Sequence, residues 1–168
     1  MPEAARVGAA RGFDVSLWEA SDRLGGNLWP AGAPAFKNDI ADYIHYLQTT
    51  VRKLPVAVVL NKRATASDVI NFNADDVIVA TGAVMEPLTF PSASDAKVMT
   101  AIGALNGEEL EGRKVIVIGG GIMGTETALY LAQQGRAVTI ITRRAADQLA
   151  VELFDHNNRL MLLRMVQA

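Results

Sequence analysis

The chain has 168 residues, a formal net charge of −2 and hydrophobic residues at half of its positions. Because this charge is near zero and no lysine or arginine run occurs, the sequence lacks the electrostatic pattern of a nucleic-acid-binding protein. No apolar stretch reaches about 18 residues and no signal-peptide pattern is present, so we expect no membrane partner and a cytoplasmic location. The absence of cysteine excludes a disulfide, a redox-active cysteine pair and a thiolate-held cluster within these residues, and two histidines argue against a metal site.

Strand and helix patterns alternate along the first half of the chain. The segment at 38–54 carries apolar residues at helical spacing and Asp39 near its start, which predicts an amphipathic helix. The apolar run at 76–82 ends at a glycine and is typical of a buried strand. In chain order, the expected segments are a helix at 3–11, a strand at Val15–Glu19, a glycine turn at 22–26, a loop at 27–37, a helix at 38–54, a strand at Val56–Leu60, a short helix around Ser67–Phe72 and a strand at 76–82.

The same alternation continues in the second half. Prolines and several Ser and Asp residues make 84–96 the best linker candidate. The expected segments after it are a connector at 97–112, a strand at 114–118, a helix at 122–134, a strand at Ala137–Ile141 and a final helix at 151–166. Strands that alternate with helices predict an α/β fold, with an open, mostly parallel sheet and helices on both faces.

The most informative motif is the glycine pattern after the strand at 114–118. Gly119, Gly121 and Gly124 have the G-x-G-x-x-G spacing, and a helical pattern follows without a break. In such a motif the first glycine permits a tight turn, the second lets backbone N–H groups approach a pyrophosphate, and the third lets the helix pack close to the strand. The pattern therefore predicts a dinucleotide at the N-terminus of the helix, where the helix dipole favours an anion.

An internal repeat divides the chain into two units. When the N-terminal segment is shifted by 123 positions, Glu3 aligns with Glu126 and Met1 falls on Gly124. The first copy therefore lacks its opening strand and its first two glycines, and we expect a fragment of a longer chain. The expected domains are two Rossmann-like units, both incomplete: residues 1–96, which include the linker, and residues 97–168, which lack later strands.

The residue at the end of the second strand indicates which dinucleotide binds. In such units an acidic residue about 20 positions past the first glycine binds the adenosine ribose. That position is Glu19 in the first copy, which suits the free ribose hydroxyls of FAD or NAD. In the second copy it is Thr142, followed by Arg143 and Arg144, whose guanidinium groups suit a 2′-phosphate. The arginines favour NADPH over NADH, and the alternative is that both are solvated loop residues.

Two such units in tandem resemble the flavoproteins with two dinucleotide-binding domains, in which the first unit binds FAD and the second binds NAD(P)H. Arg6, the turn at Asp22–Gly26 and the loop at 31–34 make the chain most similar to the C-terminal FAD/NAD(P)-binding region of the old yellow enzyme-like NADH:flavin oxidoreductases. This group includes 2,4-dienoyl-CoA reductase and trimethylamine dehydrogenase. The resemblance is carried by residues 3–7, 17–26, 74–82 and 115–124.

The resemblance implies cofactor contacts in both units. FAD would be held by Glu19, Arg23, Gly25, Gly26, Thr81 and Gly82. The nicotinamide dinucleotide, NADPH or NADH, would be held by Gly119, Gly121, Gly124, Glu126, Thr142, Arg143 and Arg144. No side chain is expected to act as an acid, a base or a nucleophile, and none to bind a metal.

The resemblance also implies a function. In full-length relatives an FMN-bearing (β/α)8 barrel and an iron–sulfur cluster precede this region, so FMN, cluster and barrel are expected only in a missing N-terminal part. The chain would pass hydride from nicotinamide to flavin within an enoyl/dienoyl-CoA reductase-like or amine dehydrogenase-like enzyme, and alone it is expected to be inactive. A non-catalytic NAD(P)H-binding sensor module is the alternative, and an S-adenosylmethionine methyltransferase would not explain the repeat.

Overall fold

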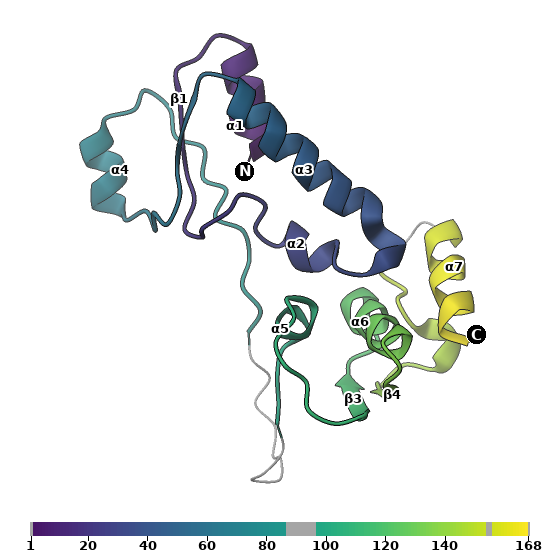
Figure 1. The fold of residues 1–168 in the computed structure, drawn as a ribbon. Helices are drawn as coiled ribbons and strands as arrows, with labels where there is room; N and C mark the ends of the chain where they lie inside the picture. Colours follow the sequence, from purple (N-terminus) through teal and green to yellow (C-terminus); the bar gives the residue numbers. More distant parts are fainter. Residues whose placement is uncertain (1, 87–96, 154–155, 168) are drawn as a thin grey trace. The chain divides into compact units, whose positions relative to one another are not determined.

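The computed structural model describes residues 2–86, 97–153 and 156–167, and the chain divides into two compact units (Figure 1). Unit 1 consists of residues 1–33 and 37–84, and unit 2 consists of residues 34–36 and 85–168. Each unit contains one pair of parallel strands with helices packed beside it. The α/β class and the parallel strand direction agree with the prediction from the sequence. The described strands form two separate two-stranded sheets, however, and not one open sheet.

Unit 1 is built around the parallel pair of β1 and β2. Their register runs from Val15 opposite Val56 to Trp18 opposite Val59. The long helix between them is the connection that parallel strands require. The elements are α1 (Pro2–Ala10), β1 (Val15–Trp18), α2 (Leu28–Ala31), η1 (Ala35–Lys37, at the boundary of the units), α3 (Asn38–Lys53), β2 (Val56–Val59) and α4 (Ala66–Phe72).

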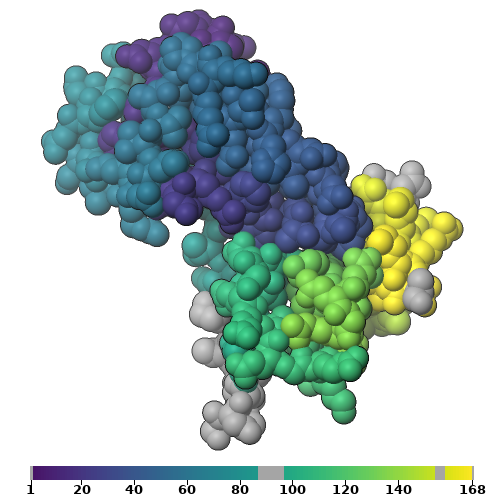
Figure 2. Space-filling view, in the orientation of Figure 1, coloured from purple at the N-terminus to yellow at the C-terminus, as the bar shows by residue number. Residues whose placement is uncertain are grey.

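The apolar stripe of α3 forms much of the core of unit 1. Ile44, Leu47 and Val51 are buried, and they follow the spacing of one helical face. Ala5 and Ala9 of α1 are buried as well, and α1 packs against α3. The amphipathic helix predicted at 38–54 is thus confirmed, and Figure 2 shows α3, in blue, with its other face on the surface. The loop predicted at 27–37 instead contains the short helix α2 and the turn η1.

The prediction of a strand at 76–82 is wrong. Residues 76–86 have no regular secondary structure, and the side chains of Ile78 and Val79 are 74% and 79% exposed. A strand needs a neighbour that pairs with its backbone N–H and C=O groups, and an unpaired one leaves them to water. The only strand partner of β1 among the described residues is β2, so no ladder reaches this apolar run.

Unit 2 contains the glycine pattern between two parallel strands. Lys114 pairs with Ala137 and Ile118 with Ile141, so that the two strands are in register over their full length. The elements are α5 (Ala101–Leu105), β3 (Lys114–Ile118), α6 (Ile122–Gln133), β4 (Ala137–Ile141), η2 (Ala146–Gln148) and α7 (His156–Gln167). The strand–helix–strand order predicted for 114–141 is confirmed, whereas α5 lies in the expected connector and α7 begins later than the predicted helix at 151.

The core of unit 2 lies where α6 and α7 meet the segment after β4. Leu129, Ala150 and Leu162 form one buried cluster, with Ile122 and Leu153 among the apolar side chains packed against it. Ala150 is fully buried, at 0% exposure. Because Ala150 is buried against α6, the segment after β4 stays close to this helix. The same segment lies beside the glycine turn, where the N–H of Ala150 donates to the carbonyl of Gly120.

Candidate functional site

The glycine turn of unit 2 joins the end of β3 to the start of α6. Gly119 has a φ of +118°, a backbone conformation that residues other than glycine rarely adopt. A Cβ atom on Gly124 would lie 2.1 Å from the carbonyl oxygen of Gly119, so this position also requires glycine. These two glycines therefore have the geometry expected for the first and third glycines of a dinucleotide fingerprint.

The middle of the turn differs from its two ends. Gly121 is the N-cap of α6, with an ordinary φ of −76° and no side chain to cap the helix. The first turn of α6 has no acidic residue either, so its first N–H groups are left for another acceptor. This open N-terminus of a 12-residue helix is where a pyrophosphate binds in the fold class.

Gly120 is a further required glycine that the spacing of the motif did not reveal. It is buried, and a Cβ atom there would lie 2.6 Å from Leu149 Cδ2 and 2.8 Å from Thr142 Oγ1. The backbone carbonyl of Gly120 accepts a hydrogen bond from the N–H of Ala150 at 2.9 Å. The run of three consecutive glycines was the only sequence signal for this close packing.

Glu152 is the site residue that sequence reasoning missed. The three atoms nearest to a Cβ atom built on Gly121 are its carboxylate atoms, with Oε1 at 3.3 Å. Its Oε1 also lies 2.5 Å from Nη1 of Arg144. The pKa of Glu152 lies below its ordinary value because its own backbone N–H, the Arg144 guanidinium and the N–H of Ile122 all favour the charged carboxylate. No local pattern marks this glutamate, because the contact depends on how the chain folds back after β4.

The structure distinguishes the three residues predicted at the adenosine end. Thr142 lies beside Gly120, and its Oγ1 accepts a hydrogen bond from the backbone N–H of Arg144 at 3.2 Å. Arg144 is half-buried and forms the ion pair with Glu152, whereas Arg143 is exposed. Nη1 of Arg144 is shielded from solvent, and its charged neighbour is Oε1 of Glu152. Glu126 is half-buried one turn into α6.

In unit 1, Glu19 stands at the carboxyl end of β1. Its backbone N–H donates to the carbonyl of Val59, which extends the ladder by one bond. Its side-chain Oε1 accepts from both the N–H and the hydroxyl of Ser21, each at 2.9 Å. The guanidinium of Arg23 lies over the ring of Trp29, 4.3 Å from its centroid. Glu19 is thus held by the turn that follows β1, and Arg23 by a residue of α2.

One hydrogen bond connects the two segments of unit 1 that carry the remaining predicted residues. The side-chain amide of Asn27 donates to the carbonyl of Ala83 at 2.8 Å, which places Gly26 near Gly82. Gly25 has a φ of +132°, and a Cβ atom there would lie 2.6 Å from Nε1 of Trp29, so it is a turn glycine. The positions that lie in irregular, exposed backbone are Gly26, Thr81 and Gly82.

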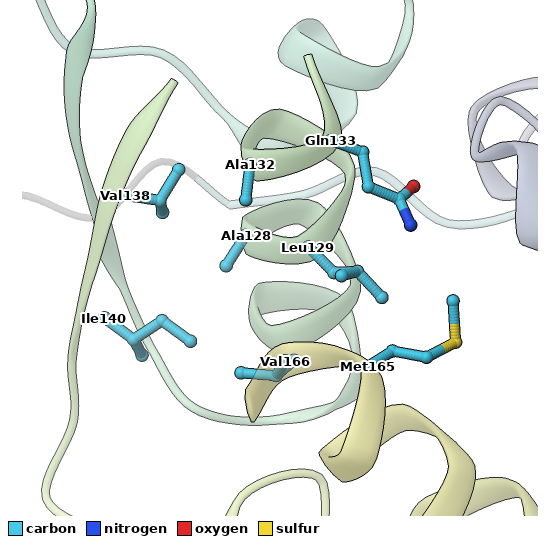
Figure 3. A pocket seen from close by; sticks show the side chains of 8 residues that line it. All are labelled: Ala128, Leu129, Ala132, Gln133, Val138, Ile140, Met165 and Val166. Atoms are coloured by element: carbon cyan, nitrogen blue, oxygen red, sulfur yellow. The ribbon is translucent and has the colours of Figure 1, made fainter. Parts of the chain in front are cut away.

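A cavity of about 300 Å³ lies elsewhere in unit 2, between α6, β4 and α7 (Figure 3). Apolar side chains and Gln133 line it, and none of the predicted cofactor residues does so. The cavity lacks the convergent polar groups of a cofactor site. Within the described ranges, no three metal-ligating side chains gather, and no helix is long and apolar enough to cross a bilayer.

The parallel strand pair, the glycine turn and the open helix N-terminus define an α/β protein of the Rossmann-like, dinucleotide-binding class. The chain belongs to the pyridine nucleotide-disulphide oxidoreductase family, which matches residues 3–168. It is therefore an FAD- and NAD(P)-binding region of a flavoprotein oxidoreductase. The resemblance to the old yellow enzyme-like NADH:flavin oxidoreductase and 2,4-dienoyl-CoA reductase group is confirmed.

Individual relatives agree with this placement. A cinnamate reductase from Clostridium sporogenes is 43% identical over 139 residues, which are 83% of this chain and 21% of that protein. A 2-naphthoyl-CoA reductase structure superposes with a TM-score of 0.82 and 28% identity, over 99% of this chain and 25% of that one. Histamine dehydrogenase from Rhizobium sp. 4-9 shares the fold, with a TM-score of 0.76 and 23% identity over 98% of this chain and 28% of that one.

The match covers only part of each relative. The chain spans about a fifth of the length of the curated relatives that it matches. What the chain shares with them is therefore the cofactor-binding region.

Proposed function

We propose that the chain binds NAD(P)H and FAD and serves as the electron-entry part of a larger flavin-dependent reductase. Unit 2 would hold the nicotinamide dinucleotide and unit 1 the FAD, as in the two incomplete Rossmann-like units expected at 97–168 and 1–96. The single observation that carries the proposal is the backbone of the glycine turn, where Gly119 and Gly124 both require glycine and Gly121 leaves the helix N-terminus open.

The residues of unit 2 fit a pyridine dinucleotide. The uncapped N–H groups at the start of α6 suit its pyrophosphate, and this N-terminus already attracts an anion, the carboxylate of Glu152. Thr142 and Arg144 lie beside the turn, on the side where the adenosine would extend. Arg144 carries a fixed positive charge near this position and supports NADPH over NADH.

The residues of unit 1 fit part of FAD. Glu19 lies at the end of the second strand of its unit, where a carboxylate binds ribose hydroxyls. The hydrogen bond from Asn27 to Ala83 brings Gly26 and Gly82 close enough to contact one ligand. Residues 2–84 contain no counterpart of the turn at Gly119–Gly124, so unit 1 has no equivalent glycine turn to bind the flavin pyrophosphate.

When both cofactors are bound, they supply the redox chemistry, a hydride transfer from nicotinamide C4 to flavin N5. The side chains named above bind and orient, and none acts as an acid, a base or a nucleophile. The electrons would leave toward an FMN-bearing barrel domain in the remainder of the protein. An enoyl-CoA or dienoyl-CoA thioester, or an amine, would be the final substrate class, by analogy with the relatives.

A nucleotide titration of the purified chain tests the dinucleotide site. We expect NADPH to bind with a 1:1 stoichiometry, measured by calorimetry or by nicotinamide fluorescence. Gly121→Ala should weaken binding strongly without unfolding the chain, because its φ of −76° accepts alanine and the methyl group enters the pyrophosphate position. Gly112→Ala is the matched control, because Gly112 lies before β3, at the end opposite to the glycine turn. Its φ of +84° makes this variant more strained than Gly121→Ala, yet NADPH binding should not weaken.

The titration also separates the proposal from the sensor alternative. FAD that co-purifies or binds on addition, and that bleaches near 450 nm with NADPH, supports the reductase. NADPH binding without any flavin binding supports a non-catalytic sensor module. Equal binding by wild type and Gly121→Ala would contradict the placement of the dinucleotide on the glycine turn.

A further inference from the structure

The position where a pyrophosphate would bind is held by the chain's own Glu152. Its carboxylate lies against the open face of Gly121, with Oε1 at 3.3 Å and Oε2 at 3.6 Å from a Cβ atom built there. The N–H of Ile122, the first residue of α6, is among the groups that lower the pKa of this carboxyl. Since α6 has neither an acidic residue in its first turn nor a capping side chain, Glu152 supplies the negative charge that this helix end favours.

Glu152 also neutralises the cation that the 2′-phosphate would need. Nη1 of Arg144 lies 2.5 Å from its Oε1, and the two side chains are 37% and 42% exposed. Arg144 follows β4 directly, whereas Glu152 comes after the turn η2. One carboxylate therefore contacts both groups that would hold the phosphates of NADPH.

The backbone around Glu152 is anchored to the glycine turn. Ala150 N–H donates to the carbonyl of Gly120 at 2.9 Å, and the side chain of Leu149 packs against Gly120. The guanidinium of Arg159, from α7, donates to the carbonyl of Leu149 at 3.0 Å. These contacts fix the backbone, so the exposed carboxylate can leave the turn by side-chain rotation while the segment stays in place.

We propose that Glu152 is an intramolecular competitor of the dinucleotide, which occupies the pyrophosphate position and pairs with Arg144 until NAD(P)H displaces it. This inference rests on the proposed function and adds regulation of dinucleotide binding at the same site. Binding exchanges one anion for another, so the chain keeps the helix end and the arginine neutralised in both states. Displacement of Glu152 lowers the apparent affinity, and it releases Arg144 for the 2′-phosphate only when a dinucleotide is present.

Glu152→Gln tests the proposal, because glutamine keeps the size of the side chain and removes its charge. We expect the Kd for NADPH to fall roughly two- to tenfold, in line with the strength of single charge interactions at helix ends and in exposed ion pairs. Glu111→Gln is the matched control: this carboxylate is also ion-paired, with Lys97, but it lies before β3 at the end opposite to the glycine turn. Its Kd should equal that of the wild type.

A double-mutant cycle with Arg144→Ala gives a second readout. In the wild type this change removes the phosphate contact but also the ion pair that must be broken on binding. In the Glu152→Gln background only the phosphate contact is lost, so Arg144→Ala should weaken NADPH binding by a larger factor there. Glu152→Ala provides the same comparison with a shorter side chain, and thermal unfolding of each variant without ligand shows that the fold is retained.

The outcomes separate the two proposals. NADPH binding by the wild type that neither Glu152→Gln nor Glu152→Ala strengthens overturns the competitor role and leaves the proposed function standing. Failure of the wild type and of both variants to bind NADPH or NADH overturns the proposed function, and the competitor role with it. Additive effects of Arg144→Ala and Glu152→Gln also overturn the competitor role.

Discussion

Gly124 and Gly119 are in contact through backbone: a Cβ atom on Gly124 would lie 2.1 Å from the carbonyl oxygen of Gly119. The obstacle is a main-chain atom, so it cannot move aside as a flexible side chain would. This contact lets the first turn of α6 pack against the end of β3. The relationship therefore connects the glycine pattern in the sequence to the geometry of the anion site.

Gly124→Ala should destabilise unit 2, because the methyl group forces α6 away from β3. Overpacking of this kind costs about 1–3 kcal/mol, and it should appear as a lower midpoint of unfolding in urea or on heating. NADPH binding should weaken in parallel, measured by titration at a temperature where the variant is folded. An unchanged midpoint would contradict the close contact between Gly124 and the carbonyl of Gly119.

Arg144→Ala should weaken NADPH binding more than NADH binding, because only NADPH carries the 2′-phosphate. A lost hydrogen bond to a charged group costs about 1.5–3 kcal/mol. Arg143→Ala is the matched comparison, since Arg143 is adjacent in sequence but exposed, and its effect should be smaller. The measurement is the ratio of the two dissociation constants for each variant. The same loss for NADH and NADPH would contradict recognition of the phosphate.

The N-terminus of α4 should lose stability in acid. Lys62 and Thr65 hydrogen-bond to Asp68 and hold the pKa of this carboxyl well below its usual range. A folded-state pKa below the unfolded value stabilises the helix above the unfolded pKa of about 3.9, and the contribution is lost as the pH falls below that value. Amide hydrogen exchange across 66–72 should therefore show less protection at acid pH. In Asp68→Asn the protection should depend much less on pH.

Ile78→Asp should leave the stability of unit 1 nearly unchanged. This side chain is 74% exposed in a segment without regular structure, and surface changes usually shift stability by about 0.5 kcal/mol or less. Val51→Asp is the control, since Val51 is fully buried in the α3 core and should unfold the unit. The measurement is the thermal midpoint of each variant. A large loss for Ile78→Asp would indicate that this run is paired as a strand, as the sequence pattern predicts.

Much of the fold follows from local patterns. The helical spacing of Ile44, Leu47 and Val51 predicted α3 and its buried face, because the period of 3.6 residues places these side chains on one stripe. The order of β3, glycine turn, α6 and β4 was also predictable. A positive φ and a close backbone contact each require glycine, and the positions of the glycines can be read directly from the sequence.

The run at 76–82 shows where local patterns fail. Its apolar residues and its terminal glycine are those of a buried strand, and the pattern predicted one. Strand formation depends on a neighbour far away in the sequence, and no described strand supplies it.

The sequence alone therefore determined the type of fold, the turn at Gly119–Gly124 and the class of ligand, because each depends on residues close together in the chain. Only the tertiary structure decided what lies on that turn. Arg144 and Glu152 meet because the chain folds back after β4 and is anchored by Ala150 on Gly120. A contact between side chains from separate segments is set by packing, and no spacing rule within one segment predicts it.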